Sequence, residues 1–206
     1  MKESRLWSAG KIGIPGRASG LMDGPDRWEA LQQVPFDPFL IGDMVLLSHY
    51  ERLPLICTWY ERGELDGTSL NQLLADSWSH GGYPYDIGWD IADWVELFED
   101  AGFVSDQPGT VPPTEPITVF RGGPPGSERG MSWTTDKALG EFFATRNVWR
   151  EGAAELWQST ILPEYVYGLF FHRQESEVVL NPDMLGEIMT LATYTGEKSD
   201  EIRSWD

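Results

Sequence analysis

The stretch that decides the fold of the C-terminal half is "FHRQESEVVLNP", Phe171–Pro182. Its polar, acidic first part leads directly into Val178–Leu180, an apolar run that predicts a buried strand. Because side chains alternate between the two faces of a strand, Glu175, Glu177 and Val179 are expected to share one face. Two carboxylates on one face, at the start of an apolar strand, make this stretch a candidate site for chemistry.

Short runs of β-branched and aromatic residues, separated by Gly and Pro, surround this stretch and predict further strands. One helix is expected among them along "DKALGEFFATR", starting near Thr135 or Asp136. After Pro182 the chain holds one amphipathic patch, "DMLGEIMTLATY", and then a charged end. The expected strands are "ITVFRG", "GMSWTT", "AELWQSTIL", "EYVYGLFF" and "ESEVVL".

The chain of 206 residues divides into four parts by composition. Residues 1–25 are rich in Gly and Ser and predict a flexible arm. Residues 26–104 have a mostly helical pattern, and residues 105–116 form a Pro-rich connector. Residues 117–206 hold the expected strands. The sequence therefore predicts an α+β fold in which a mostly helical region precedes the sheet.

Helix boundaries in the N-terminal region follow from caps and breakers. Asp26 is a candidate cap for "DRWEALQQV". Pro54 should break or kink the long apolar segment that contains it. "DGTSLNQLLADSWSH" is typical of a capped helix that ends at Gly81–Gly82, and Gly102 is the expected C-terminal cap of "DIGWDIADWVELFEDA".

Charge and cysteine usage limit the class of protein. The formal net charge of −18 disfavours direct binding to nucleic acid or to an anionic membrane. The single cysteine, Cys57, lies in an apolar run and is expected to be a buried structural thiol, which fits a reducing compartment. The start of the chain lacks the apolar segment of a secretory signal, and no apolar run reaches the roughly 18 residues of a membrane span. We expect a soluble, cytoplasmic protein.

Several common site types are disfavoured by the sequence. His49, His80 and His172 have no partner at zinc-ligand spacing, and there is no CxxC, so no metal is expected. No GxSxG or GxxxxGK[ST] motif is present. "RGGPPG" follows an expected strand, but it contains two prolines and does not open a helix, so it fails the dinucleotide fingerprint.

Three polar features interrupt the expected strands. Arg121 ends "ITVF", Ser132 and Thr134 lie in "GMSWTT", and Glu175 and Glu177 begin "ESEVVL". Each of them taken singly is explained as a solvated residue at a strand end. Their occurrence in this order, on separate strands, points instead to a common site.

This ordered set resembles the mono-ADP-ribosyltransferases of the Arg-Ser-Glu class, over about residues 116–185. That family has an arginine at the end of one strand, a Ser-x-Ser or Ser-x-Thr strand followed by a helix, and an ExE or QxE motif on a later strand. The helix segment "EFFA" and the stretch "LPEYVYGLFFHRQESEVVLNP" are also similar to the family. The N-terminal half shows no comparable likeness. The resemblance implies an ADP-ribosyltransferase-like fold, with two small β-sheets around a cleft for NAD.

The resemblance implies that NAD is the co-substrate and is cleaved at its nicotinamide glycosidic bond. Glu177 would stabilise the positive charge that develops on the ribose. Glu175 would orient or deprotonate the incoming nucleophile. Arg121 would grip phosphate or ribose oxygens, and Ser132 would hydrogen-bond the catalytic glutamate or a ribose hydroxyl.

Further contacts follow from position in the family pattern. For the aromatic residues among them, packing in the core is the alternative to contact with NAD. Arg146 and Arg150 are expected in a loop after the helix, and for them the alternative to such contact is exposure to solvent. The central Trp133 of Ser-Trp-Thr is bulkier than the residue usual in the family. The implied NAD contacts are Arg121, Gly122, Ser132, Trp133, Thr134, Phe143 and Arg146, and the implied target contacts are Phe170, Phe171 and Glu175.

An ExE motif in this family accompanies arginine modification, so "ESE" implies an arginine side chain of a protein target as acceptor. Two alternatives stay open. Water could replace the protein acceptor, which would make the protein an NAD glycohydrolase, or the fold could serve as a non-enzymatic binding module. A phage-encoded or injected effector and a toxin component are all compatible contexts, and in the injected case the compartment would be the host cytoplasm.

Overall fold

The computed structural model describes residues 33–38, 41, 47, 49–78, 89–172 and 176–196. The chain separates into two compact units, Met1–Gly102 and Phe103–Asp206. The architecture is mixed α+β, with helices in the first unit and a mixed sheet in the second. The predicted arm and residues 26–32 of the helix predicted at Asp26 lie outside the described residues, and the last two residues of that stretch, Gln33 and Val34, are not helical.

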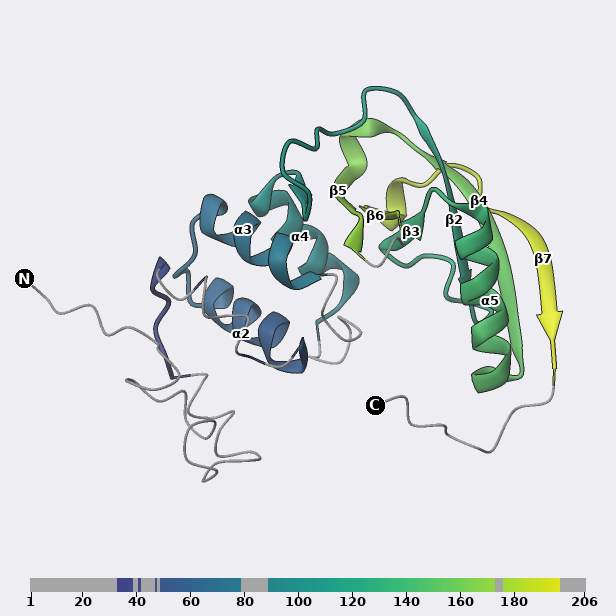
Figure 1. Ribbon diagram of the computed structural model, residues 1–206, viewed down its shortest axis with the longest axis horizontal. Coiled ribbons are helices and arrows are strands. Elements are labelled where there is room, and N and C mark those ends of the chain that lie inside the picture. Colours follow the sequence, from purple (N-terminus) through teal and green to yellow (C-terminus); the bar gives the residue numbers. More distant parts are fainter. Residues whose placement is uncertain are drawn as a thin grey trace, which may run out of the picture. The chain divides into compact units, whose positions relative to one another are not determined.

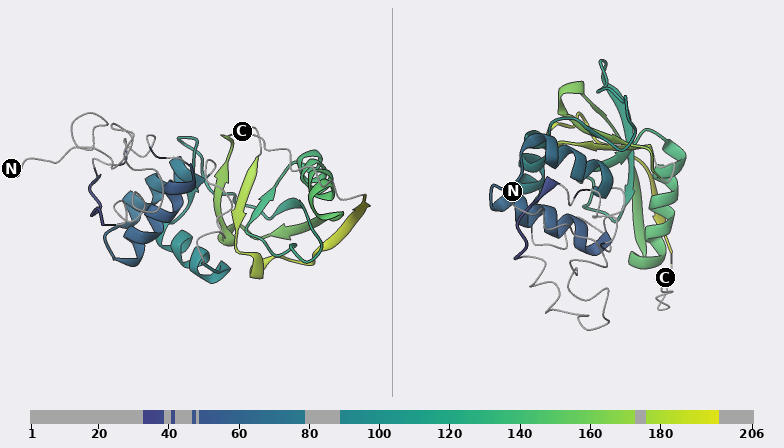
Figure 2. Two further views of the ribbon diagram at one scale, coloured as in Figure 1. Left: turned by 90° about the horizontal axis from the view of Figure 1, so that it is seen from below. Right: turned by 60° about the vertical axis from the view of Figure 1, so that its left-hand side comes forward.

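Three helices form the described core of the first unit, and their ends follow local capping chemistry. The Asp66 side chain accepts from the Ser69 backbone N–H, and Asp90 and Asp93 form a capping box. Gly102, with φ of 69°, is the C-terminal cap that the sequence predicted. Figures 1 and 2 show α2 and α3 side by side. The helices are α2 (His49–Glu61), α3 (Gly67–Ser77) and α4 (Ile91–Ala101).

The sequence analysis predicted a break or a kink at Pro54. Helix α2 continues through this residue, so the break does not occur. Proline in a helix interior costs about 3 kcal/mol. Leu53, Leu55 and Ile56 around it are almost completely buried, and burial of each such side chain contributes about 1.5–3 kcal/mol. Packing therefore outweighs the local preference.

Aromatic rings fill the rest of this core. The Trp78 ring centroid lies 4.8 Å from that of Phe98 and 5.6 Å from that of Trp94, both in edge-to-face geometry. Cys57 is buried as predicted, and burial, reinforced by Glu61, raises the pKa of its thiol. A thiol with a raised pKa is a poor nucleophile.

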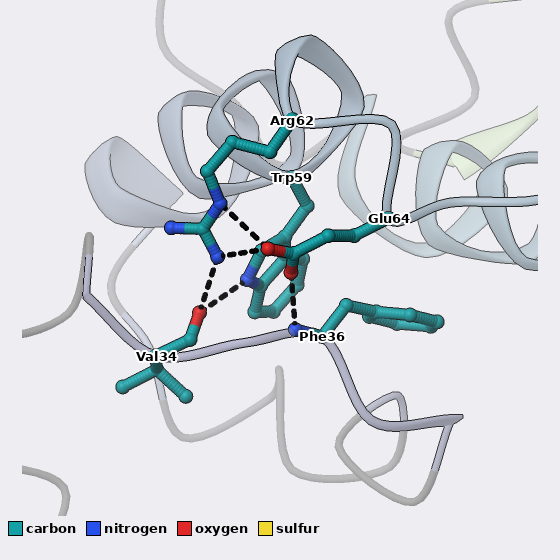
Figure 3. Close-up of polar contacts among 5 residues, drawn as sticks. All are labelled: Val34, Phe36, Trp59, Arg62 and Glu64. Carbon is teal, nitrogen blue, oxygen red and sulfur yellow. Dashed lines mark hydrogen bonds and ion pairs between the residues drawn. The ribbon is translucent and has the colours of Figure 1, made fainter.

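The segment 33–38 is fixed to the C-terminal end of α2 by a polar cluster (Figure 3). Arg62 Nη2 and Trp59 Nε1 both donate to the Val34 carbonyl, at 3.0 and 2.8 Å. Glu64 pairs with Arg62 at 2.6 Å and accepts from the Phe36 backbone N–H at 2.7 Å. One ion pair thus satisfies backbone groups of Val34 and Phe36, which belong to no helix or strand.

The second unit is a seven-stranded sheet in the order β1-β5-β6-β3-β2-β4-β7. All neighbours are antiparallel except β1 and β5. Two short 3₁₀ turns interrupt the strands: Pro163–Tyr165 follows β4, and Pro182–Met184 follows β6. The strands are β1 (Val104–Ser105), β2 (Ile117–Gly123), β3 (Ser132–Thr134), β4 (Ala153–Ile161), β5 (Val166–Phe170), β6 (Glu177–Leu180) and β7 (Met189–Thr195).

The join between β2 and β3 is the weakest in this sheet. The two strands pair at one position, Phe120 with Thr134, whereas β2 pairs with β4 along its whole length. Two small sheets were expected from the resemblance. The structure connects the two halves, β1-β5-β6-β3 and β2-β4-β7, through that single pair into one sheet.

Helix α5 (Lys137–Glu151) packs along β2 and β4 (Figures 1 and 2). Its N-terminal cap, Asp136, accepts from the Ala138 N–H, as the sequence predicted. Phe120, Ala144, Val148 and Leu156 make the core on this face. The other face carries a larger cluster: Val119, Trp133, Trp157, Ile161, Val166, Val178, Leu180 and Leu185.

Candidate active site

A carboxylate and a hydroxyl meet where β6 lies beside β3. The Ser132 hydroxyl donates to Oε1 of Glu177 at 2.5 Å. Thr134 pairs with Glu177 and Ser132 pairs with Val179 across the two strands, so the side chains of all four lie on one face. Ser132 and Glu177 are half-buried. The carboxylate of a half-buried glutamate is thus held in one orientation by the neighbouring strand.

The turn into β6 is unusually shaped. Ser176 has a φ of 45°, a left-handed conformation that costs a non-glycine residue about 1–2 kcal/mol. Its carbonyl accepts from the Thr135 N–H at 3.2 Å, which continues the pairing of β3 with β6 by one step. The left-handed residue therefore lets the chain turn and still enter the sheet with Glu177 opposite Thr134.

Arg121 supports this pair through the backbone. Its Nη1 donates to the Ser132 carbonyl at 2.5 Å and its Nε donates to the Ser127 carbonyl at 2.9 Å. The pairing of β2 with β3 stops at Phe120, so the guanidinium supplies the donor that the β2 backbone no longer provides. Arg121, Ser132 and Glu177 consequently form one continuous hydrogen-bonded chain.

Gly130 leaves the space that the Arg121 guanidinium occupies. The sequence analysis did not identify this glycine as part of the site. A β-carbon at Gly130 would lie 2.5 Å from Cζ and 2.9 Å from Nη1 of Arg121, well inside contact distance. The signal available in the sequence was the run "GSERG" just before "MSWT". That run also supplies the Ser127 carbonyl.

The other two residues of the Ser-Trp-Thr strand have packing and capping contacts. Trp133 is 2% exposed, lies in the core cluster with Val178 and Trp157, and donates from Nε1 to the Gly130 carbonyl at 2.8 Å. Alternation along β3 turns its ring away from the face of Ser132, so its bulk does not obstruct that face. We therefore leave Trp133 out of the proposed NAD contacts. Thr134 is buried, and its Oγ1 accepts from the backbone N–H that leads into α5.

Gly122 is required for the approach of α5. A β-carbon there would lie 2.9 Å from the Ala144 Cα and even closer to the Gly140 carbonyl and the Ala144 backbone nitrogen. Only glycine allows helix and strand to come this close. This accounts for Gly122 without a ligand, and its predicted NAD contact stays a prediction.

The prediction that Arg146 and Arg150 follow the helix in a loop is wrong. Helix α5 continues to Glu151, and Gly152, with φ of 80°, is the left-handed cap that ends it. The Arg146 side chain is exposed on that helix, and Phe143 is half-buried beside the exposed Phe142, with ring centroids 5.6 Å apart. Arg146 and Phe143 remain candidates for contact with NAD.

The predicted target-contact residues separate in the structure. Phe170, the last residue of β5, is 1% exposed and pairs with Glu177, so it is a core residue. Phe171 is 42% exposed just beyond that strand. Glu175 lies outside the described residues, so its predicted place beside Glu177 stays a prediction.

No group of three or more His, Cys, Asp or Glu side chains in the described part of the chain is arranged to hold a metal ion. Among those same residues, no helix is long and apolar enough to cross a membrane.

Comparison of the chain with protein-family models, with curated proteins and with solved structures finds no match.

The chemistry open to this arrangement follows from its parts. A carboxylate held by a hydroxyl on a rigid strand can stabilise developing positive charge without reorganising during the reaction. It can equally fix a hydroxyl of a bound sugar.

Proposed function

We propose that the protein is an NAD-dependent mono-ADP-ribosyltransferase of the Arg-Ser-Glu class that modifies an arginine side chain of a protein target. The observation that carries the proposal is the hydrogen bond from Ser132 to Glu177 across β3 and β6. The family pattern implies this contact, and residues 45 positions apart in the chain make it here. Arg121, the first residue of the pattern, holds the carbonyl of the same serine.

NAD supplies a nicotinamide leaving group and an ADP-ribosyl group for transfer. When the glycosidic bond breaks, its electron pair leaves with nicotinamide and positive charge develops on the ribose. Glu177 is the proposed stabiliser of that charge. The Ser132 hydroxyl fixes one carboxylate oxygen of Glu177, and since a carboxylate is planar, the direction of the other oxygen is fixed as well.

NAD also carries a diphosphate, which this acidic chain as a whole would repel. Local cations must therefore hold it. The exposed Arg146 on α5 is one candidate, because α5 lies along β2 and β4 on the same sheet face onto which Glu177 and Ser132 project. The family pattern gives Arg121 as another candidate, and in the structure its Nε and Nη1 engage two backbone carbonyls.

In the transfer step an arginine nitrogen of the target attacks the anomeric carbon as nicotinamide leaves. A bond from that nitrogen to carbon forms, and the proton it loses goes to the carboxylate of Glu175 and from there to water. If water takes the place of the arginine, the same bond breaks and free ADP-ribose results.

The test compares Glu177→Gln with Glu155→Gln, using nicotinamide release and transfer of radiolabelled ADP-ribose from NAD to lysate proteins. In Glu177→Gln, the glutamine side chain keeps the shape and the acceptor for Ser132 but loses the charge. Glu155 is a half-buried glutamate of the same sheet that accepts from Trp157 Nε1. We expect Glu177→Gln to lose about 100-fold or more in nicotinamide release, as for other groups that stabilise a transition-state charge, and Glu155→Gln to match wild type.

Three outcomes would change the proposal. Equal nicotinamide release by Glu177→Gln and wild type would remove Glu177 as the catalytic residue. Release without labelled protein would favour an NAD glycohydrolase. A folded wild-type protein that neither binds nor cleaves NAD would favour a binding module.

A further inference from the structure

The second unit begins with a strand at the point where the sequence analysis placed the boundary between the helical region and the connector. Val104 and Ser105 form β1, which pairs in parallel with Gly168 and Leu169 of β5. The Ser105 hydroxyl adds a bond of 2.7 Å to the Leu169 carbonyl. Residues just before the Pro-rich run are therefore fixed to the end of β5 that leads toward Phe171.

Asp106, the next residue, binds the backbone where the chain leaves β5. Its Oδ1 accepts from the Phe171 N–H at 2.9 Å, and its Oδ2 accepts from the Phe171 N–H at 3.1 Å and from the His172 N–H at 2.8 Å. Hydrogen bonds from N–H groups to a carboxylate are stronger than those to a neutral acceptor. The carboxylate thus satisfies two successive backbone donors that have left the sheet ladder.

Phe171, whose N–H is held by Asp106, exposes 42% of its surface and is one of the proposed target contacts. Glu177 is held separately, from β3: the Thr135 N–H donates to the carbonyl of the left-handed Ser176, and the Ser132 hydroxyl donates to the Glu177 carboxylate. Asp106 therefore positions a proposed target contact, while β3 holds the proposed catalytic glutamate.

We propose that Asp106 is a positioning residue for the protein acceptor. By fixing the Phe171 and His172 amides, it orients the exposed Phe171 toward the target and so sets how much ADP-ribose passes to protein rather than to water. This inference rests on the proposed transferase function. Cleavage of NAD depends on Glu177, Ser132 and Arg121, which Asp106 does not contact in the described structure, so loss of Asp106 separates transfer from cleavage.

The test uses the full chain as wild type, Asp106→Ala, Asp106→Asn and Asp66→Ala. Asp66→Ala is the matched control, because Asp66 also accepts from a backbone N–H but caps α3 in the first unit. Nicotinamide release measures cleavage, and radiolabel from NAD on poly-L-arginine measures transfer. Amide hydrogen exchange at Phe171 and His172 reports the contact itself.

We expect Asp106→Ala to lower the ratio of transfer to cleavage about tenfold, which corresponds to about 1.4 kcal/mol. Total nicotinamide release should stay at the wild-type level, and the two amides should lose protection. Asp106→Asn should restore the ratio, because Oδ2 accepts from both amides and one amide oxygen in its place can do the same. Asp66→Ala should leave the ratio unchanged.

An unchanged ratio in Asp106→Ala would overturn the inference while leaving the proposed function standing. The inference also fails if Asp66→Ala lowers the ratio equally, since the effect would then be general destabilisation. A wild-type protein that releases no nicotinamide would overturn the proposed function, and this inference with it.

Discussion

The substitution Gly130→Ala tests whether Arg121 holds β3 in place. The new β-carbon would lie 2.5 Å from Cζ of Arg121, so the guanidinium must move. Moving it breaks the bonds to the Ser127 and Ser132 carbonyls. The φ of Gly130 lies outside the left-handed range, so alanine meets no backbone strain there and the effect is confined to the side chain it displaces.

The magnitude follows from those two bonds. A buried hydrogen bond that involves a charged group contributes about 1.5–3 kcal/mol, but Arg121 is half-buried and its displaced guanidinium can bind water, so we expect about 2 kcal/mol for the pair. Replacing glycine by alanine gains back about 0.5 kcal/mol through the unfolded chain. Gly130→Ala should therefore destabilise the second unit by about 1.5 kcal/mol. When Arg121 is already alanine, the same substitution should stabilise it by about 0.5 kcal/mol.

A double-mutant cycle of Gly130→Ala and Arg121→Ala measures the coupling. Urea unfolding gives the free energies, and amide exchange at Ser132 and Trp133 localises the change to β3. We expect a coupling of about 2 kcal/mol and a parallel fall in nicotinamide release by Gly130→Ala. Additive free energies, within about 0.5 kcal/mol, would show that Gly130 and Arg121 act independently and would refute this account of the site.

Three further predictions concern stability. Gly122→Ala should cost about 3 kcal/mol in thermal unfolding, because its β-carbon would meet the backbone of α5, whereas Gly140→Ala should cost less, because its nearest neighbour is a side chain that can shift. Ser176→Gly should stabilise the unit by up to about 1 kcal/mol, since glycine escapes the left-handed penalty of about 1–2 kcal/mol and loses about 0.5–1 kcal/mol of it to chain entropy, whereas Ser176→Val should destabilise it, because a β-branched side chain is crowded at a φ of 45°. A hydrogen bond from the Ser69 backbone lowers the pKa of Asp66, so its stabilisation is complete above about pH 4 and is lost as pH falls through the lowered pKa. The difference in unfolding free energy between wild type and Asp66→Ala should accordingly shrink in acid and stay constant near neutrality.

Local signals predicted most elements of the second unit. The strands of "ITVFRG" and "AELWQSTIL" and the start of α5 at Asp136 follow from alternation and capping, which act within a few residues. The missing pieces are those that depend on distant partners. A two-residue strand such as β1 has no pattern of its own and exists because β5 lies beside it.

The site followed the same division. The order of Arg121, Ser132 and Glu177 is visible in the sequence. The position of Arg121, however, depends on bonds to backbone carbonyls and on the space left by the missing side chain of Gly130. Such contacts leave little trace in residue type. The sequence analysis ended α5 too early. Its continuation "TRNVWRE" contains no helix breaker, and the helix extends to the next glycine.

Stability alone does not account for every residue of the pattern. Gly122 is explained by the approach of α5, and Arg121 is explained by the carbonyls it joins. The pair of Ser132 and Glu177 is different. As a half-buried cross-strand contact, their hydrogen bond contributes about 0.2–1 kcal/mol. In a chain with a net charge of −18, one more carboxylate also adds repulsion. Under the proposed function the charge of Glu177 serves catalysis, and Glu177→Gln, which keeps the shape and removes the charge, separates that role from a purely structural one.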